Sequence, residues 1–400
     1  MTVIIIGGGA SGMAAALSAA KNGNKVLLLE RQNRVGRKLL ATGNGRCNLT
    51  NTNMAPKFFH SQQPEFFKSV LSAFNTEKAL EFFHGLGLVT TEEASGRVYP
   101  LSDQAGSVVD VLRFALDAAG VTVMTSCEVT AVYPLQSGFE VVTDTERING
   151  DKVIICCGGM AGSKLGGVKL GYDLLKSLGH SITKLYPSLV QVKTDDTYVK
   201  SLKGVRADAG VTLHQWGSVI AASAGEVQFT EYGVSGPAIF EISRAASVNK
   251  ADLTVHLDLL KDMSPETISA LISRRIETMP DLTIENLLTG ILHNRLGRTV
   301  LRYAGFDMNQ PITSLDSKAI DSITAAIKNF TLPVTDTLNF ESAQVTAGGA
   351  KTEQFNPKTM ESLLVPGLYA AGEVLDVDGD CGGYNLQWAW ASGYIAGMTL

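Results

Sequence analysis

A glycine-rich turn near the start of the chain constrains its fold more than any other feature. Residues 2–6 form a short apolar run, the turn GGGASG occupies residues 7–12, and a second apolar run ends at Glu30. The two runs are typical of buried parallel strands, and the small residues 10–22 between them are typical of a helix. The order strand, glycine turn, helix, strand and acid predicts a dinucleotide-binding βαβ unit.

Each glycine of this turn has its own physical task in such a unit. Gly7 makes the tight turn, Gly9 lets the backbone approach a pyrophosphate, and Gly12 lets helix and strand pack closely. The positive end of the helix then faces the phosphates, and the carboxylate of Glu30 is placed to bind ribose hydroxyls. We therefore predict a dinucleotide at this turn.

The far end of the chain indicates which dinucleotide binds. Residues 367–387 predict a strand that ends in Gly372-Glu373, followed by a second glycine turn and a helix of about 385–398. This pattern is typical of the flavin end of two-dinucleotide-fold flavoproteins, where the helix start near Asn385 stabilises negative charge on the reduced ring. No second strand–GxGxxG–helix unit is present, so we predict one non-covalent FAD rather than NAD alone.

A polar loop follows the ribose-binding acid. Its centre, TGNGRCN at 42–48, holds too many glycines for simple packing, and we interpret it as the wall beside the isoalloxazine. Arg37 and Lys38 either reach phosphate or are solvated surface cations. The polar groups expected closest to the substrate, and hence our catalytic candidates, are Asn44, Arg46, Tyr384 and Asn385.

The middle of the chain predicts a different architecture. Helical patterns at about 64–86 and 104–119 precede strands at 121–124, 127–134, 138–143 and 152–156. From about residue 185 to 260 the sequence alternates and is rich in turns, which predicts an antiparallel barrel or sandwich, and residues 264–329 have helical periodicity. The simplest topology is a cofactor domain made from both chain ends, with a separate insertion between them.

Composition excludes several classes of protein. The net charge of −5 and the lack of a Lys/Arg block disfavour a nucleic-acid partner, and the glycines in the apolar stretch 3–20 disfavour a membrane span. Six scattered histidines predict no metal site. Five cysteines without a CxxC motif indicate a reducing cytoplasm, although Cys47 and Cys381 both fall on loops expected near the flavin and raise the hypothesis of a redox dithiol.

Several motifs together resemble the BaiN-like family of bacterial FAD-dependent flavoproteins, also labelled aminoacetone-oxidase-like. They are GGGASGMAAALSAA, GRKLLATGNGRCNLTN, TAGGA and GEVLDVDGDCGGYNLQWAWASG, and they span nearly the whole chain. This chain departs from the family motif FTH-x-G-x-SGP, because Glu231 occupies the position of the histidine. Cys381 also replaces an expected non-cysteine, so substrate does not carry over from the resemblance.

The resemblance implies an α/β FAD-binding Rossmann-like domain with an inserted β-barrel-like part and a small helical bundle. We expect the FAD domain at 1–186 and 342–400, the barrel at 187–260 and 330–341, and the helical subdomain at 261–329. The residues expected to bind the cofactor are Gly7, Gly9, Ala10, Ser11, Gly12, Glu30, Arg31, Arg37, Lys38, Thr42, Gly43, Asn44, Gly45, Cys47, Asn48, Val129, Gly158, Gly372, Glu373, Gly382, Gly383, Asn385, Leu386 and Gln387.

Flavin chemistry alone leaves the direction of the reaction open, because members of the resembled family are linked both to amine oxidation and to enone reduction. We favour a reductase that transfers hydride between flavin and a small organic substrate, with NAD(P)H as a diffusible co-substrate. The first alternative is an oxygen-using amine oxidase of the aminoacetone type. Alternatives of another class are an FAD-dependent RNA-modifying protein and a non-catalytic flavin-binding protein.

Overall fold

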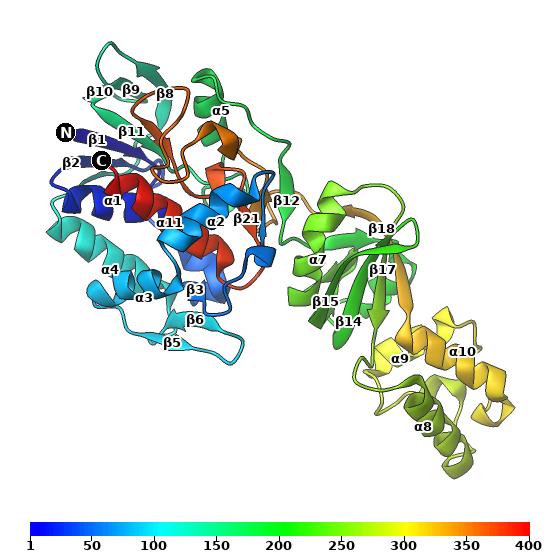
Figure 1. Cartoon of the computed structure of the whole chain (residues 1–400). Coiled ribbons are helices and arrows are strands. Elements are labelled where there is room, and N and C mark those ends of the chain that lie inside the picture. Colours follow the sequence, from blue (N-terminus) through cyan, green and yellow to red (C-terminus); the bar gives the residue numbers. More distant parts are fainter. The chain divides into compact units, whose positions relative to one another are not determined.

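The computed structural model describes residues 1–400, which divide into two compact units. Unit 1 consists of Met1–Tyr186 together with Gln344–Leu400, and unit 2 is Pro187–Ala343. The short strands β12 (Tyr186–Ser188) and β19 (Val345–Ala347) mark the two points where the chain passes from one unit to the other. Unit 1 is therefore built from both ends of the chain, coloured blue to green and orange to red in Figure 1.

A five-stranded parallel sheet forms the centre of unit 1. Its order is β20-β11-β1-β2-β7, with bounds Leu368–Ala370, Lys152–Ile155, Thr2–Ile6, Lys25–Leu29 and Thr122–Met124. The strands predicted at 2–6 and 152–156 pair directly with each other, and the C-terminal strand β20 adds to the edge beside β11. The predicted N-terminal βαβ unit is confirmed, and β2 ends one residue before Glu30.

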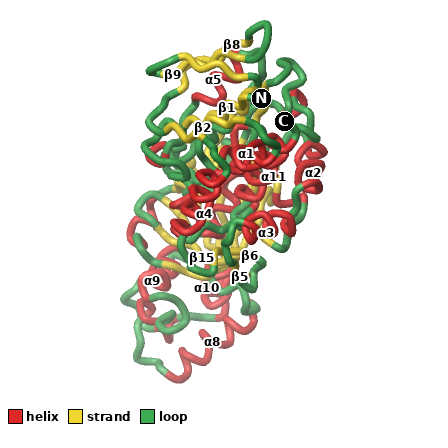
Figure 2. Tube along the Cα trace, turned by 90° about the vertical axis from the view of Figure 1, so that its left-hand side faces the viewer, coloured by secondary structure: helices red, strands yellow, loops and turns green.

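Helices α1 (Ala10–Lys21) and α11 (Tyr384–Met398) lie side by side in both views of the molecule (Figure 1, Figure 2). Two glycines of α11 make this approach possible. A methyl group on Gly393 would lie 2.2 Å from the carbonyl oxygen of Ser11, and one on Gly397 would lie 2.2 Å from that of Ala15. The two helices thus touch backbone to backbone, which ties the last residues of the chain to the first.

Smaller elements complete unit 1. Three antiparallel groups are β10-β9-β8 (Arg147–Gly150, Phe139–Thr143, Val129–Pro134), β3-β6-β5 (Thr50–Asn51, Arg97–Pro100, Thr90–Glu92) and β21-β4 (Asp378–Gly379, Phe59–His60). The helices are α2 (Pro64–Ala73), α3 (Thr76–Gly85), α4 (Ala105–Ala118) and α5 (Leu170–Ser177). The helical stretch predicted at 64–86 is two helices, because Asn75 caps α3 by accepting a hydrogen bond from Lys78 N at 3.0 Å.

Unit 2 holds a closed antiparallel barrel, as the alternating pattern predicted. Its strand order is β13-β16-β15-β14-β17-β18, with bounds Val192–Thr194, Gly233–Ser235, Ser218–Phe229, Arg206–Gln215, Leu253–Asp258 and Phe330–Thr337. The helices are α6 (Asp196–Val199), α7 (Pro237–Val248), α8 (Pro265–Thr278), α9 (Asn294–Tyr303) and α10 (Ser317–Lys328). Helix α7 interrupts a stretch predicted as strands only, and barrel and helices share one hydrophobic core. None of the helices in the structure combines the length and apolar character that a membrane crossing needs.

The contact between α1 and α11 predicts that even one added methyl group is costly. Gly393→Ala should lower the free energy of unfolding by about 1–3 kcal/mol, because the new Cβ meets backbone that cannot rotate away. Gly106→Ala is the matched control, since Gly106 lies in α4 with open space around its Cβ position and should keep or slightly raise stability. Denaturant unfolding measures both, and equal effects would contradict the proposed backbone contact.

A buried histidine predicts a pH dependence of stability. His180 stacks on Phe355 with ring centroids 4.6 Å apart, its Nε2 lies 3.0 Å from the Ser362 hydroxyl, and burial lowers its pKa from the usual 6.5. Below about pH 6.5 His180 binds a proton in the unfolded chain but stays neutral in the folded protein. The free energy of unfolding therefore decreases as the pH is lowered. Unfolding measured from about pH 7 to about pH 5 should show a shallower fall in H180Q than in wild type. Parallel curves would assign the dependence to other groups.

Candidate functional site

Of the three glycines that form the GxGxxG pattern, two are tightly packed and one is open. A Cβ on Gly7, where φ is +108°, would lie 2.4 Å from the Cys156 carbonyl oxygen, and one on Gly12 would lie 1.9 Å from that of Gly7. Gly9, in contrast, has no atom within 4 Å of its Cβ position. The space in front of Gly9 adjoins the start of α1, where Ala10 is the first helical residue. A phosphate group fits this combination of backbone access and helix dipole.

Two backbone N–H groups orient the carboxylate of Glu30 at the end of β2. Its Oε2 accepts a hydrogen bond from Gly8 N at 2.8 Å, and its Oε1 accepts one from Gln32 N at 2.7 Å. Each oxygen keeps a further lone pair for a ligand hydroxyl. The Cys127 N–H donates a hydrogen bond to the Glu30 carbonyl at 3.0 Å. Val129, two residues later, is buried and begins β8.

The cations that follow Glu30 have separate partners. Arg31 donates to the Gly166 carbonyl at 3.5 Å, and Arg37 donates to the side-chain oxygen of Gln32. Lys38 forms an ion pair of 2.7 Å with Glu373, more than three hundred residues away in sequence. Of the three, only Lys38 connects the N-terminal loop with the C-terminal segment.

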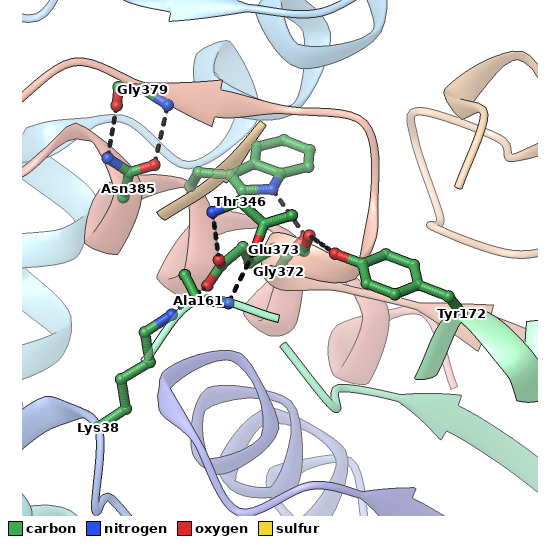
Figure 3. Close-up of polar contacts among 9 residues, drawn as sticks. Lys38, Ala161, Tyr172, Thr346, Gly372, Glu373, Gly379 and Asn385 are labelled. Carbon is green, nitrogen blue, oxygen red and sulfur yellow. Dashed lines mark hydrogen bonds and ion pairs between the residues drawn. The ribbon is translucent and has the colours of Figure 1, made fainter. Parts of the chain in front are cut away.

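Figure 3 shows how the Glu373 carboxylate is held. Besides Lys38, it accepts a hydrogen bond from Thr346 N at 2.8 Å, while the Thr346 hydroxyl accepts one from Ala161 N at 3.0 Å. Gly159 leaves the room for this network, because a Cβ there would lie 2.6 Å from a Glu373 oxygen. Thr346 belongs to the TAGGA motif, which sequence reasoning noticed but gave no role.

Gly372, which precedes this carboxylate, sits against both α11 and α1. It has φ +81°, and a Cβ there would lie 2.5 Å from the Ser11 hydroxyl oxygen. Its N–H donates to the Ser392 hydroxyl at 2.9 Å, and its carbonyl accepts from the Trp388 indole at 3.0 Å. Gly158, at the end of the neighbouring strand β11, is also left-handed at φ +70° and has open space before it.

Left-handed backbone shapes the polar loop that follows Lys38. The 3-10 segment Leu39–Gly45 is broken at Gly43 and Asn44, and Gly45 and Cys47 are left-handed as well. The Thr42 hydroxyl donates to the Leu39 carbonyl at 2.7 Å and fastens the start of the turn. Asn44 is exposed at the outer edge of the loop.

The loop turns inward after Cys47. Burial raises the pKa of the Cys47 thiol to about 12, so this cysteine does not supply the thiolate that a redox dithiol with Cys381 would need at neutral pH. The next side chain, Asn48, is buried, and its Oδ1 has no hydrogen-bond partner. A buried acceptor without a donor is rare in folded proteins, and an N–H group of a ligand would satisfy this one.

The end of the loop and the residues that follow it contact the C-terminal glycine turn. A Cβ on Gly383 would lie 2.6 Å from the Thr50 carbonyl oxygen and 2.9 Å from Asn48 Oδ1. Asn51 donates to the Gly382 carbonyl at 2.9 Å, and the Thr50 hydroxyl donates to Gln387 at 2.7 Å. Residues 48–51 and 382–387 therefore form one wall, although most of the chain separates them.

The four catalytic candidates differ in what their side chains contact. Arg46 lies 3.9 Å over the ring of Tyr99 and pairs with Glu93 at 2.9 Å and with Asp103. Tyr384, on the C-terminal turn, stacks on Phe58 with ring centroids 4.6 Å apart. Its neighbour Asn385 forms hydrogen bonds of 2.8 Å and 2.6 Å with the backbone of Gly379 and one of 3.3 Å with the backbone of Asp380. Asn385 thus orients the turn that precedes it (Figure 3). The next residue, Leu386, is half-buried.

Sequence reasoning missed a hydrogen-bonded pair beside this turn. His60 Nε2 lies 2.7 Å from Asp380 Oδ1, and strand β4, which carries His60, pairs with the Asp378–Gly379 strand. Asp376 and Asp378 are buried nearby in the same segment. Their alternation with glycine in DVDGDCGG was visible in the sequence, but nothing in it linked them to a histidine more than three hundred residues away.

Comparisons with known proteins bear on this site. A family profile described as the HI0933-like protein Rossmann domain matches residues 1–399. A 3-dehydro-bile acid delta(4,6)-reductase of Clostridium scindens is 40% identical over 400 residues, 99% of this chain and 98% of that protein. A ribosomal RNA dihydrouridine synthase of Escherichia coli is 31% identical over 402 residues, 99% and 97% of the two chains. A solved 3-ketosteroid-delta4-(5alpha)-dehydrogenase of Rhodococcus jostii is 15% identical with a TM-score of 0.48, covering 99% of this chain and 96% of that one.

The geometry of Glu30 predicts its effect on cofactor affinity. Glu30→Ala should weaken FAD binding at least tenfold, because charge-assisted hydrogen bonds to the ribose are each worth about 1.5–3 kcal/mol. Glu146→Ala removes an exposed carboxylate of the same unit and should leave affinity unchanged. Fluorescence titration of apoprotein with FAD compares them, and unchanged affinity in the Glu30 variant would mean that the ribose binds elsewhere.

Proposed function

Because this chain belongs to the HI0933-like family and is an FAD-dependent oxidoreductase, we propose that it reduces a carbon–carbon double bond conjugated to a carbonyl group. The resemblance to BaiN-like flavoproteins inferred from the motifs is confirmed by this membership. The observation that carries the proposal is the pair of relatives matched over nearly their whole length, a delta(4,6)-reductase and a dihydrouridine synthase. Both names describe saturation of a carbon–carbon double bond next to a carbonyl.

The residues of unit 1 fit an FAD molecule. In our proposal the pyrophosphate lies at the open position before Gly9, the ribose hydroxyls bind Glu30, and the flavin lies against residues 42–48, 372–373 and 382–387. The unpartnered Asn48 Oδ1 supports the flavin end, because a ring N–H would satisfy it. Bound FAD supplies the hydride acceptor and donor, which no side chain of the protein can replace.

The chain's own residues would then hold and tune the ring. The start of α11 at Tyr384 presents the positive end of a helix dipole, which favours negative charge developing on a nearby flavin. The Lys38–Glu373 pair joins the N-terminal loop to the C-terminal segment, and the Asn385 bonds to Gly379 fix the turn within that segment. Such preorganisation lowers the cost of charge development during hydride transfer.

We further propose that NAD(P)H is a diffusible reductant. The sheet of unit 1 contains one strand–glycine turn–helix unit with an acid at the second strand, and that unit is assigned to FAD. The segment after β11 runs instead into the short 3-10 turn Ser163–Leu165. A nicotinamide cofactor would therefore bind only during turnover.

The two relatives point to two substrates for the same chemistry. The first candidate is a small cyclic enone, as in the relative at 40% identity. The second is a uracil base in RNA, favoured by the full-length match to a ribosomal RNA dihydrouridine synthase. Both present a double bond polarised by a carbonyl, so both accept a hydride at the carbon β to it.

Anaerobic reduction of the purified yellow protein tests the reductase proposal. NADH or NADPH should bleach the flavin absorbance, and a 3-oxo-4-ene bile acid or protein-free ribosomal RNA should restore it faster than air does. Product is checked by mass spectrometry for the saturated acid or for dihydrouridine. If aminoacetone bleaches the flavin, oxygen restores it rapidly and NAD(P)H is inert, the protein is an amine oxidase and the proposal fails.

A further inference from the structure

One surface of unit 2 gathers positive charge although acids outnumber bases in this unit. Helix α9, labelled in Figure 1, carries Arg295, Arg298 and Arg302. Their spacings of three and seven residues place them on one side of the helix. Lys200 and Lys203 come from the turn around the 3-10 segment Lys200–Leu202. We call these five residues the α9 basic face.

Direct hydrogen bonds hold this face together. The Arg295 guanidinium donates to the Ser201 carbonyl at 3.3 Å and to the Lys203 carbonyl at 3.2 Å. The turn that carries the two lysines is thereby fastened beside the helix that carries the arginines. The backbone segments that carry the five cations are therefore held next to each other.

The face keeps a positive excess after its ion pairs are counted. Arg298 pairs with Glu285 at 3.1 Å, and Lys203 pairs with Glu231 at 2.7 Å. Lys200 and Arg302 are exposed and form no ion pair. The Lys203 hydrogen bond, together with the charge of Lys200, lowers the pKa of Glu231, so this one carboxylate serves both lysines. Two acids therefore serve the five cations, and Arg295 is bound only to neutral carbonyl groups.

Folding alone does not require this arrangement. The opposite side of α9 is buried through Leu296 and Val300, so the outer side needs only polar residues. Lys261 of the same unit shows the opposite balance, since it pairs with both Asp208 and Asp262. Like charges held close together repel each other, so a cluster of cations with few acids is a cost that an anionic partner removes.

We propose that the α9 basic face binds the phosphate backbone of RNA. This inference rests on the proposed function. Of the two candidate substrates it favours the second, a uracil in RNA. Arginine donors match phosphate oxygens in a bidentate fashion, and a row of such contacts positions a strand without reading its sequence. The net charge of −5 is a sum over the whole chain and does not describe the local charge of the α9 basic face.

The test uses the full-length, FAD-loaded protein and a fluorescein-labelled, uridine-rich single-stranded RNA. The double variant Lys200→Gln, Arg302→Gln removes the two unpaired cations and leaves Arg295 in place. We expect its Kd to rise about tenfold and the slope of log affinity against log salt to fall by about 1.4, for two lost phosphate contacts. The matched control is Arg274→Gln, Lys318→Gln, which removes two exposed, unpaired cations elsewhere in unit 2 and should bind like wild type.

Three outcomes would overturn the proposal. If the wild-type protein does not bind the RNA at low salt, the proposal is wrong. If the control double variant weakens binding equally, the RNA is attracted by overall charge and not by the α9 basic face. If poly-aspartate competes as well as unlabelled RNA of equal charge, the face is a site for acidic protein. FAD reduction by NAD(P)H, measured on the same variants, reports the proposed function separately, since neither double variant touches unit 1.

Discussion

The backbone contact between α1 and α11 is the interaction on which the rest of unit 1 depends. Gly393 and Gly397 let α11 approach the carbonyl oxygens of Ser11 and Ala15 more closely than any side chain would allow. From that position α11 binds Gly372 at both its N–H and its carbonyl, through Ser392 and Trp388. The C-terminal half of the site is thus placed by α11, which is itself held against α1, the helix that begins at the N-terminal glycine turn.

The parts of this molecule that sequence predicted are those governed by local rules. A strand, a glycine turn and a helix are encoded within about twenty residues, and Glu30 follows because a carboxylate at the second strand's end is a local signature. The barrel was predicted from period-two alternation, which needs no knowledge of partners. Helix α7 was missed because it follows a glycine–proline pair typical of a turn.

The candidate site was predicted by residue type, but not by the partners of each residue. Arg46 and Asn385 were chosen for their polarity, yet one is matched by Glu93 and Asp103 and the other is bonded to its own turn. Conversely, Lys38 with Glu373 and His60 with Asp380 join residues more than three hundred positions apart. No local pattern encodes such pairs, because they exist only after the two chain ends pack together.

The construction of unit 1 from both ends of the chain also orders events during synthesis. When residues 187–343 leave the ribosome, the sheet still lacks its edge strand β20 and α1 still lacks α11. Unit 2 is continuous in sequence and has its own hydrophobic core, so it has everything it needs to fold first. Until the last residues emerge, the surface of α1 that α11 later covers stays exposed to water. The nascent chain therefore holds an incomplete nucleotide-binding unit until synthesis ends.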